Sequence, residues 1–321
     1  MDLLSHLGIF PDGIVGHSLG ELGCAYADGC FTAEQAVLAA YSRGKAIMES
    51  KLQTGAMAAV GLTWEQAKTR CPTDIYPACH NAQDSVSISG PVESICKFVD
   101  ELKSEGIFAK VVQSSGQAFH SKYIAPAGPK LRKALEQIIP EPKPRSKKWI
   151  SSSIPEDKWN SELAHWSGPD YHVNNFLSQV LFQEALAHVP EDALVIEIAP
   201  HCLLQAILKR SLGASCINVG LMSRTAPDNS IYFLSSIGKI FIGGQNPKIA
   251  NLFDEVSFPV TLGTPMISSM VKWDHSKSWD IAKFDKVHFY NIFKEWIFLG
   301  VVYSVIIFRA LENRKGFMKS L

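Results

Sequence analysis

One stretch near the N-terminus decides the predicted fold: PDGIVGHSLGELGCAYA, residues 11–27. A short apolar strand is predicted at residues 14–15, and a helix of small residues is predicted at 22–27. The GxSxG pattern of residues 16–20 lies between them, at a strand-to-helix turn. Such a turn exposes the serine hydroxyl, and the start of the helix offers free N–H groups to a developing oxyanion. The stretch therefore predicts a nucleophilic Ser18 in an α/β fold.

The chain after this stretch alternates strands with helices. A second strand–loop–helix unit is predicted at residues 193–210, and this alternation is typical of a core around a mostly parallel sheet. Between residues 52 and 121, short β-like runs and two helical runs follow the order βαββαβ, which predicts an inserted small subdomain. The predicted boundaries are an α/β core at 1–51 and 122–246, the small subdomain at 52–121, an extended linker at 247–282 and an apolar and basic tail at 283–321.

The composition indicates an intracellular globular protein that does not bind nucleic acid. The 321 residues carry 31 basic and 31 acidic side chains, so the net positive charge of a nucleic-acid-binding protein is missing. The seven cysteines form no CxxC pair, and an odd number of scattered thiols favours a reducing compartment over a disulfide framework. The N-terminus has no signal-peptide pattern, so we expect a cytoplasmic location.

Neither a cofactor site nor a membrane span is predicted. The cysteines and histidines make no recognised zinc spacing, and the chain contains no GxxxxGK[ST] or GxGxxG motif. We therefore expect no bound metal, nucleotide or redox cofactor. The tail has twelve consecutive apolar or small residues at 297–308, fewer than the roughly 18–20 that span a bilayer. Lengthening this segment to 287–308 includes Lys294 and Glu295, so we do not expect a membrane as a partner.

A nucleophilic serine needs a general base, and the chain has ten histidines. His17 is adjacent to Ser18, but neighbouring side chains at a tight turn point in different directions, which makes it a poor base. His120 ends the inserted segment, where the chain returns to the core, and this would place it in the cleft between the two subdomains. From the residues alone, five other histidines stay open as alternatives: His80, His165, His172, His188 and His201.

Arg43 and Glu21 are two further charged residues for which the sequence suggests a role. Arg43 lies seven residues after Ala36 and four before Ile47, so it falls on the apolar stripe of its helix. A buried arginine there needs a carboxylate or a phosphate, and gripping a substrate carboxylate is its natural use. The alternatives are a side chain that reaches solvent at the edge of the stripe, or a pair with a structural acid. Glu21 opens a helix, and the helix dipole is an adequate explanation for it.

The sequence around Ser18 resembles a known family. GHSLGE, residues 16–21, is similar to the active-site signature of malonyl/acetyl-CoA:acyl-carrier-protein transacylases. The resemblance covers residues 2–280. The strings that resemble the version of this domain in animal type-I fatty acid synthases are PDGIVGHSLGE at 11–21, EQAVLAAYSR at 34–43, GAMAAVG at 55–61, PACHN at 77–81, AFHS at 118–121, VLFQEA at 180–185, EIAPH at 197–201 and KWDHS at 272–276.

This resemblance implies a fold, a reaction and partners. The fold is a hydrolase-like parallel-sheet core with an inserted ferredoxin-like small subdomain. The reaction moves malonyl or acetyl groups from CoA to the phosphopantetheine of acyl carrier protein, through an acyl-serine intermediate, in fatty acid biosynthesis. The implied partners are acyl carrier protein and the other fatty acid synthase domains, including the ketosynthase side through a linker. The resemblance implies no bound cofactor.

The resemblance also assigns roles to individual residues. The nucleophile of the family falls on Ser18, its general base on His120 and its carboxylate-gripping arginine on Arg43. In this family a backbone carbonyl orients the histidine, so no acidic third member is needed. The further substrate-binding positions are His17, Leu19 and Phe119.

Two departures from the family pattern leave other functions open. The domain of the family starts earlier, with a first strand and a GQG-type loop that supplies an oxyanion donor, so we expect an N-terminally truncated fragment with only the Leu19 N–H. Losing one such donor costs about 10² to 10³ in rate. From about Lys283 the sequence also departs from the family. The alternatives are therefore a serine hydrolase or thioesterase, or an inactive truncated remnant of a fatty acid synthase.

Overall fold

The computed structural model describes residues 1–255 and residues 258, 259, 263, 270, 272, 274 and 276. The predicted tail at 283–321 and much of the predicted linker lie outside the described residues. Contacts divide the chain into two compact units, one of Pro11–Arg224 and one of Met1–Phe10 with the chain from Thr225. The site discussed below lies within Pro11–Arg224, and each unit is described by itself.

The predicted α/β class is confirmed in the unit Pro11–Arg224. Strand β1 (Ile14–Val15) pairs in parallel with β7 (Trp149–Ile150), and β10 (Leu194–Glu197) pairs in parallel with β11 (Ile217–Gly220). Within the described residues, these four strands form two separate pairs and not one continuous sheet. The other elements of the core are α2 (Gly20–Ala27), α3 (Ala33–Met48), η1 (Lys122–Ala127), α6 (Gly128–Ile138), β6 (Lys143–Pro144), η2 (Glu156–Lys158), α7 (Glu162–His165), β8 (Trp166–Ser167), α8 (Pro169–Leu177), β9 (Val180–Leu181), α9 (Phe182–Leu186) and α10 (Gln205–Ser211).

Helix α3 shows how the local sequence sets the helical layer. Thr32 caps its start, because the Thr32 side chain accepts a hydrogen bond from the Gln35 N–H and the Gln35 side chain accepts one from the Thr32 N–H. These two bonds form a capping box, which the Thr-x-x-Gln pattern of residues 32–35 predicts. Ala39 and Ala46 are buried on the side of α3 that faces a cluster of large side chains from α6 and α8, among them Leu131 and Phe176.

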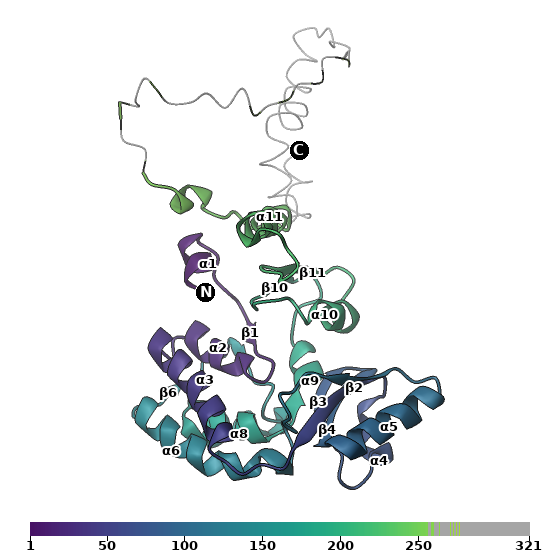
Figure 1. Ribbon diagram of the computed structural model, residues 1–321. Coiled ribbons are helices and arrows are strands. Elements are labelled where there is room, and N and C mark those ends of the chain that lie inside the picture. The colour runs from purple at the N-terminus through teal and green to yellow at the C-terminus, as the bar shows by residue number, and fades with distance from the viewer. Residues whose placement is uncertain are drawn as a thin grey trace. The chain divides into compact units, whose positions relative to one another are not determined.

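The inserted segment folds as the predicted βαββαβ subdomain. Its sheet has the order β5-β2-β4-β3 with antiparallel neighbours, which is the ferredoxin-like arrangement. Helices α4 and α5 pack on one face of this sheet (Figure 1). Helix α5 buries Ile95, Phe98, Val99 and Leu102, whose spacing places them on one side of the helix. The elements are β2 (Gly55–Val60), α4 (Trp64–Arg70), β3 (Tyr76–Ala82), β4 (Ser85–Pro91), α5 (Val92–Ser104) and β5 (Ala109–Val112).

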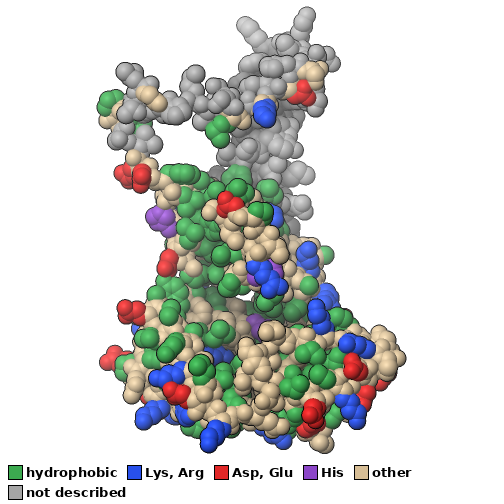
Figure 2. All heavy atoms as spheres, in the orientation of Figure 1, with side chains coloured by type: hydrophobic (Ala, Val, Ile, Leu, Met, Phe, Trp, Pro, Cys, Tyr) green, Lys and Arg blue, Asp and Glu red, His purple; other side chains and the backbone are tan. Residues whose placement is uncertain are grey.

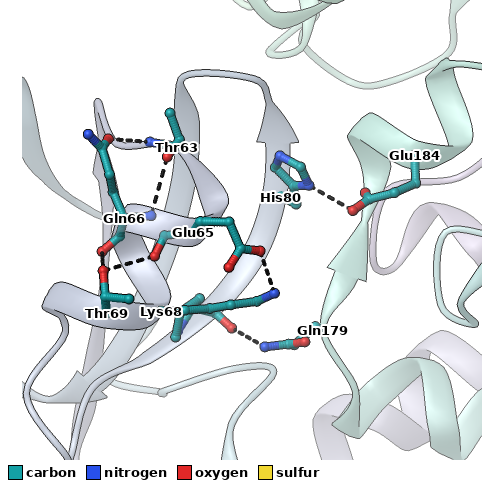
Figure 3. A network of polar contacts seen from close by, with 9 residues as sticks. Thr63, Glu65, Gln66, Lys68, Thr69, His80, Gln179 and Glu184 are labelled. Carbon is teal, nitrogen blue, oxygen red and sulfur yellow. Dashed lines mark hydrogen bonds and ion pairs between the residues drawn. The ribbon is translucent and has the colours of Figure 1, made fainter.

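A strand from the core completes the sheet of the small subdomain. Strand β9 pairs in parallel with β3, with Val180 opposite Cys79. Two side chains support this junction (Figure 3): the Gln179 amide donates to the Pro77 carbonyl over 2.8 Å, and His80 Nδ1 lies 2.8 Å from a Glu184 carboxylate oxygen. The small subdomain and the core therefore share one sheet, which the sequence pattern did not predict.

The second unit and the surface add two observations. In the second unit, helix α1 (Asp2–His6) lies beside η3 (Ile249–Leu252), and His6 and Asn251 bond reciprocally over 2.6 Å. Helix α11 (Asn229–Ile242) precedes η3 in the chain. On the visible face of the unit Pro11–Arg224, charged side chains of both signs are interspersed (Figure 2), in keeping with a net charge of zero. No helix in the described part of the chain is long and apolar enough to cross a membrane.

Candidate active site

Ser18 lies at the turn between β1 and α2. Its φ angle is 52°, in the left-handed region that a non-glycine residue rarely adopts. The turn passes so close to the start of α2 that a Cβ at Gly16 would lie 2.5 Å from the Glu21 nitrogen. A Cβ at Gly20 would meet nothing within 4 Å, so only the first of the two glycines is required by space. Of the two glycines in the GxSxG pattern, Gly16 therefore relieves crowding and Gly20 does not.

The side chain of Ser18 contacts His120. Ser18 Oγ and His120 Nε2 are 2.7 Å apart, although the two residues are 102 positions apart in the sequence. His120 follows the small subdomain, is 4% exposed and also has a left-handed φ, 57°. The structure thus brings together the two residues that the resemblance assigns as nucleophile and general base.

The protonation of His120 follows from its second contact. His120 Nδ1 lies 2.7 Å from the Ser178 carbonyl oxygen, which only accepts hydrogen bonds, so Nδ1 carries the proton. Burial lowers the pKa of His120 to about 3, and the positive charge of Arg43 acts in the same direction. The imidazole is therefore neutral at ordinary pH, and its Nε2 accepts the Ser18 hydroxyl proton.

The first turn of α2 offers a backbone donor beside Ser18. The N–H groups of Gly20 and Glu21 bond back to the carbonyls of His17 and Ser18. Leu19 caps the helix, and its N–H has no hydrogen-bond partner within the described part of the chain. This N–H is free to meet an oxyanion next to Ser18 Oγ.

Arg43 is buried without a carboxylate. Its side chain projects from α3 and is 7% exposed. One guanidinium nitrogen donates to Asn175 Oδ1 over 2.7 Å, and the guanidinium carbon lies 5.1 Å from the centre of the Phe176 ring. Among the described residues no Asp or Glu lies within ion-pair distance of it. Burial lowers the pKa of Arg43 to about 10, so the side chain keeps its positive charge at neutral pH.

The other residues that the resemblance assigned to substrate binding line the same region. His17 Nε2 lies 2.8 Å from Asn81 Oδ1 on β3, and its ring meets the Phe182 ring edge-on, so His17 connects the serine turn to the small subdomain and does not contact Ser18 Oγ. Phe119 packs against both hydrophobic clusters that border the site. Leu19 is about half exposed, at 52%.

The five alternative histidines have other partners. His80 contacts Glu184, His172 is buried against Ser167, and His188 lies 3.4 Å from Glu156. The ring of His165 meets the Trp166 ring edge-on, and His201 Nδ1 accepts the Arg224 N–H. Among the described histidines, His120 alone bonds to Ser18.

Glu21 has more than the helix-dipole role that the sequence suggested. Its side chain is completely buried, and one oxygen accepts hydrogen bonds from Trp149 Nε1 over 2.8 Å and from the Tyr171 hydroxyl over 2.6 Å. The other oxygen accepts the Ser152 N–H over 2.8 Å, and Ser152 Oγ lies 2.5 Å from the Gly16 carbonyl. The dipole interpretation is thus incomplete, because the buried carboxylate fixes the turn that carries Ser18.

Helix α8 supplies further residues that sequence reasoning missed. Asn175 near its end contacts Arg43, and Ser178, which caps its end, contacts His120 through its carbonyl. The Asn174 side chain accepts from the Ser178 hydroxyl over 2.8 Å. One helix end therefore orients both the proposed base and the buried arginine. No local sequence pattern marks this helix end, since its partners lie in distant segments.

The comparisons with known proteins agree with this arrangement. The acyl transferase domain family matches residues 1–247. The chain belongs to this family. Trichosetin synthetase PKS-NRPS1 of Gibberella fujikuroi is 35% identical over 219 residues, 64% of this chain and 6% of that protein. The highly reducing polyketide synthase rstn3 of Aspergillus nomiae is 33% identical over 261 residues, 76% of this chain and 10% of that protein.

Two solved structures resemble this acyl transferase domain. The acyltransferase domain from the second module of the salinomycin polyketide synthase has a TM-score of 0.66 at 21% identity, over 78% of this chain and 58% of that one. The acyltransferase domain of the polyketide synthase PpsC of Mycobacterium tuberculosis has a TM-score of 0.58 at 25% identity, over 68% of each chain.

These matches bear on the expected fatty acid synthase setting of the acyl transferase domain. The relatives described above are polyketide synthases, so the comparisons give the domain family but do not single out an animal fatty acid synthase. The chain spans only 6% and 10% of the lengths of the two curated relatives.

Across the described residues, no group of three or more His, Cys, Asp or Glu side chains forms a metal site.

Proposed function

We propose that this acyl transferase domain moves malonyl and acetyl groups from CoA to the phosphopantetheine thiol of acyl carrier protein, through an ester on Ser18. One observation carries the proposal. A buried, positively charged Arg43 without a carboxylate partner lies close enough to the Ser18–His120 pair to lower the pKa of His120. A malonyl group supplies the missing carboxylate.

In the first step, His120 Nε2 takes the proton of the Ser18 hydroxyl while Ser18 Oγ bonds to the thioester carbonyl carbon. The Leu19 N–H donates to the negative charge that develops on the carbonyl oxygen. The carbon–sulfur bond then breaks, and the CoA sulfur leaves with the proton from His120. The products are free CoA and an acyl ester on Ser18.

In the second step, the phosphopantetheine thiol of acyl carrier protein gives its proton to His120, and its sulfur bonds to the ester carbon. The bond between this carbon and Ser18 Oγ breaks, and Ser18 Oγ takes the proton back. The acyl group is now a thioester on the carrier, and the domain has returned to its starting state. Both steps use the neutral His120 as a base and its protonated form as an acid.

The substrate-binding roles follow from position. Arg43 binds the malonyl carboxylate, whereas an acetyl group leaves the guanidinium as it is in the structure. Phe119, which follows the small subdomain beside His120, packs along the acyl group. His17 holds the serine turn to Asn81 and thereby shapes the pocket from the side of the small subdomain.

The setting of this reaction is part of the proposal. The sequence strings resemble animal fatty acid synthases, while the curated relatives are fungal polyketide synthases, and both use the same acyl transfer. The relatives favour a polyketide synthase type of assembly, with acyl carrier protein and the neighbouring synthase domains as partners. The proposed steps need no metal or redox cofactor, and the cytoplasmic location stays a prediction.

The proposal is tested by labelling the full chain with malonyl-CoA that carries the label in the malonyl group. We expect the label on the peptide that contains Ser18, release of one CoA per labelled chain, and loss of the label to added acyl carrier protein. The Ser18→Ala variant should take no label. Ser104→Ala is the matched control, because Ser104 is an exposed serine on α5, outside the site.

Two results would contradict the proposal. A label on another residue, for instance Cys24, would assign the nucleophile elsewhere. Release of free malonate from labelled Ser18, with no transfer to acyl carrier protein, would favour a serine hydrolase or thioesterase. Because the two results concern different steps, each one identifies the step that fails.

A further inference from the structure

The contact between Arg43 and Asn175 is the most informative part of the site that the proposed steps do not use. Asn175 lies on α8 and is 1% exposed, so this contact is shielded from solvent. It is the one hydrogen bond of the Arg43 guanidinium among the described residues. A guanidinium has five N–H groups in a planar fork, so several donors remain free for a second acceptor.

The orientation of the Asn175 amide is fixed by its two neighbours. Arg43 only donates hydrogen bonds, so Asn175 Oδ1 faces it, at 2.7 Å. The amide nitrogen then points the other way and donates to Ser153 Oγ over 2.8 Å. Ser153 is itself buried, so this second bond holds the amide in one orientation. Asn175 therefore holds the guanidinium in place through a neutral oxygen.

The neutrality of this oxygen matters more than its position. A buried arginine usually pairs with a carboxylate, which cancels its charge. Aspartate has almost the same shape as asparagine, and an aspartate at position 175 would accept from both Arg43 and the Ser153 hydroxyl. The chain has asparagine instead, so the guanidinium is fixed in place without a carboxylate in contact with it.

We propose that Asn175 is a positioning residue that sets the preference of the domain for acyl groups ending in a carboxylate, because it holds Arg43 without neutralising it. This inference rests on the proposed function, since it concerns the same acyl site. Asn175 acts through Arg43 and does not touch the reacting atoms. The acyl groups it favours are dicarboxylate half-thioesters such as malonyl, over uncharged groups such as acetyl.

The test measures binding in a chain that carries Ser18→Ala, so that it does not depend on acylation. Affinities for malonyl-CoA and acetyl-CoA are determined by titration calorimetry. Asn175→Asp should weaken malonyl-CoA binding at least about tenfold, because a charge-assisted contact is lost, and change acetyl-CoA binding by less than about threefold. Asn160→Asp is the matched control, because it adds the same charge at an exposed position and should leave the ratio unchanged.

Two further variants show whether Asn175 acts through charge and through Arg43. Asn175→Ser keeps a neutral acceptor and should retain the preference for malonyl-CoA, at a reduced ratio. In a chain with Arg43→Gln, adding Asn175→Asp should not change the ratio further, because the charge on which it acts is gone. Asn175→Ser is a neutral replacement, so it keeps the test open if Asn175→Asp folds poorly.

The inference is overturned if Asn175→Asp weakens both ligands equally, or if Asn175→Ser abolishes the preference completely. It is also overturned if the Ser18→Ala chain binds the two ligands with equal affinity. Failure of the proposed function looks different: the chain with Ser18 intact takes no label, while the binding preference and its dependence on Asn175 persist.

Discussion

Ser18 and His120 both hold left-handed backbone angles, φ 52° and 57°, at the point where their side chains meet over 2.7 Å. Such angles cost a non-glycine residue about 1–3 kcal/mol and persist only where the surroundings impose them. In this protein, contacts around both residues impose these angles. Gly16 and Glu21 hold the turn at Ser18, and the Ser178 carbonyl holds the ring of His120. The geometry of the pair is therefore a property of the whole core.

The two glycines of the GxSxG pattern should respond differently to alanine. We expect Gly16→Ala to lower the free energy of unfolding by at least about 2 kcal/mol, because its Cβ would overlap the backbone at the start of α2. Gly20→Ala should change stability by less than about 1 kcal/mol, because its Cβ meets nothing within 4 Å. Urea unfolding of both variants checks the prediction, and equal losses would contradict it.

Buried histidines should make the stability depend on pH. Burial lowers the pKa of His172 to about 3 from its ordinary value of 6.5, and His120 behaves in the same way. Between these two values the unfolded chain binds protons that the folded chain does not, so stability falls as the pH drops below 6.5. Each histidine should account for a loss of about 2 kcal/mol between pH 7 and pH 5.

The variant His172→Phe tests this dependence, since His172 is surrounded by the rings of Phe31, Trp149 and Tyr171. We expect it to remove about 2 kcal/mol of the loss of stability between pH 7 and pH 5. The measurement is the free energy of unfolding at pH 7, 6 and 5 for both chains. Parallel curves for the two chains would mean that His172 takes up its proton without unfolding.

Glu21 should be far more important for stability than a first-turn glutamate usually is. Glu21→Gln replaces one acceptor oxygen with an NH₂ group that faces a donor, so we expect a loss of about 2–4 kcal/mol. Glu34 is the matched control, because it occupies the first turn of α3 and is exposed. Glu34→Gln should cost less than about 1 kcal/mol. Thermal melting compares the two, and similar shifts would restore the helix-dipole interpretation of Glu21.

Arg43→Ala should change the choice of substrate. Malonyl transfer should fall at least about tenfold, because a charge-assisted contact contributes about 1.5–3 kcal/mol. Acetyl transfer should be retained or improved, because an unpaired buried charge is removed. The ratio of kcat/KM for the two CoA esters is the measurement. Equal damage to both reactions would mean that Arg43 is structural.

The sequence predicted best what is encoded locally. The turn at Ser18 and the capping box at Thr32 each depend on a few adjacent residues, and both are present in the structure. The βαββαβ order also followed from short segments, because the apolar residues of each segment recur with the period of a strand or of a helix. The partner of Ser18 was different. Six histidines were possible, and the position of His120 after the inserted segment did not exclude the others, so the family resemblance was needed to single it out.

The missed features all depend on contacts between distant segments. Glu21 was assigned to the helix dipole because its position in the first turn was a sufficient local explanation, while its partners Trp149, Ser152 and Tyr171 lie at least 128 positions away. Asn175 is separated from Arg43 by 132 positions. Asparagine is common near helix ends, so nothing in the local pattern distinguished it.

The strand that the core adds to the sheet of the small subdomain limits how this domain can be recombined with related ones. Residues 52–121 are not a self-contained cassette, because Val180 and Leu181 form the outer strand of their sheet. Ser178, which fixes His120, lies just before that strand. A chimera that exchanges 52–121 alone separates co-adapted partners at both places. If residues 178–181 are exchanged together with 52–121, the whole shared sheet and the Ser178 carbonyl that holds His120 come from the same parent protein.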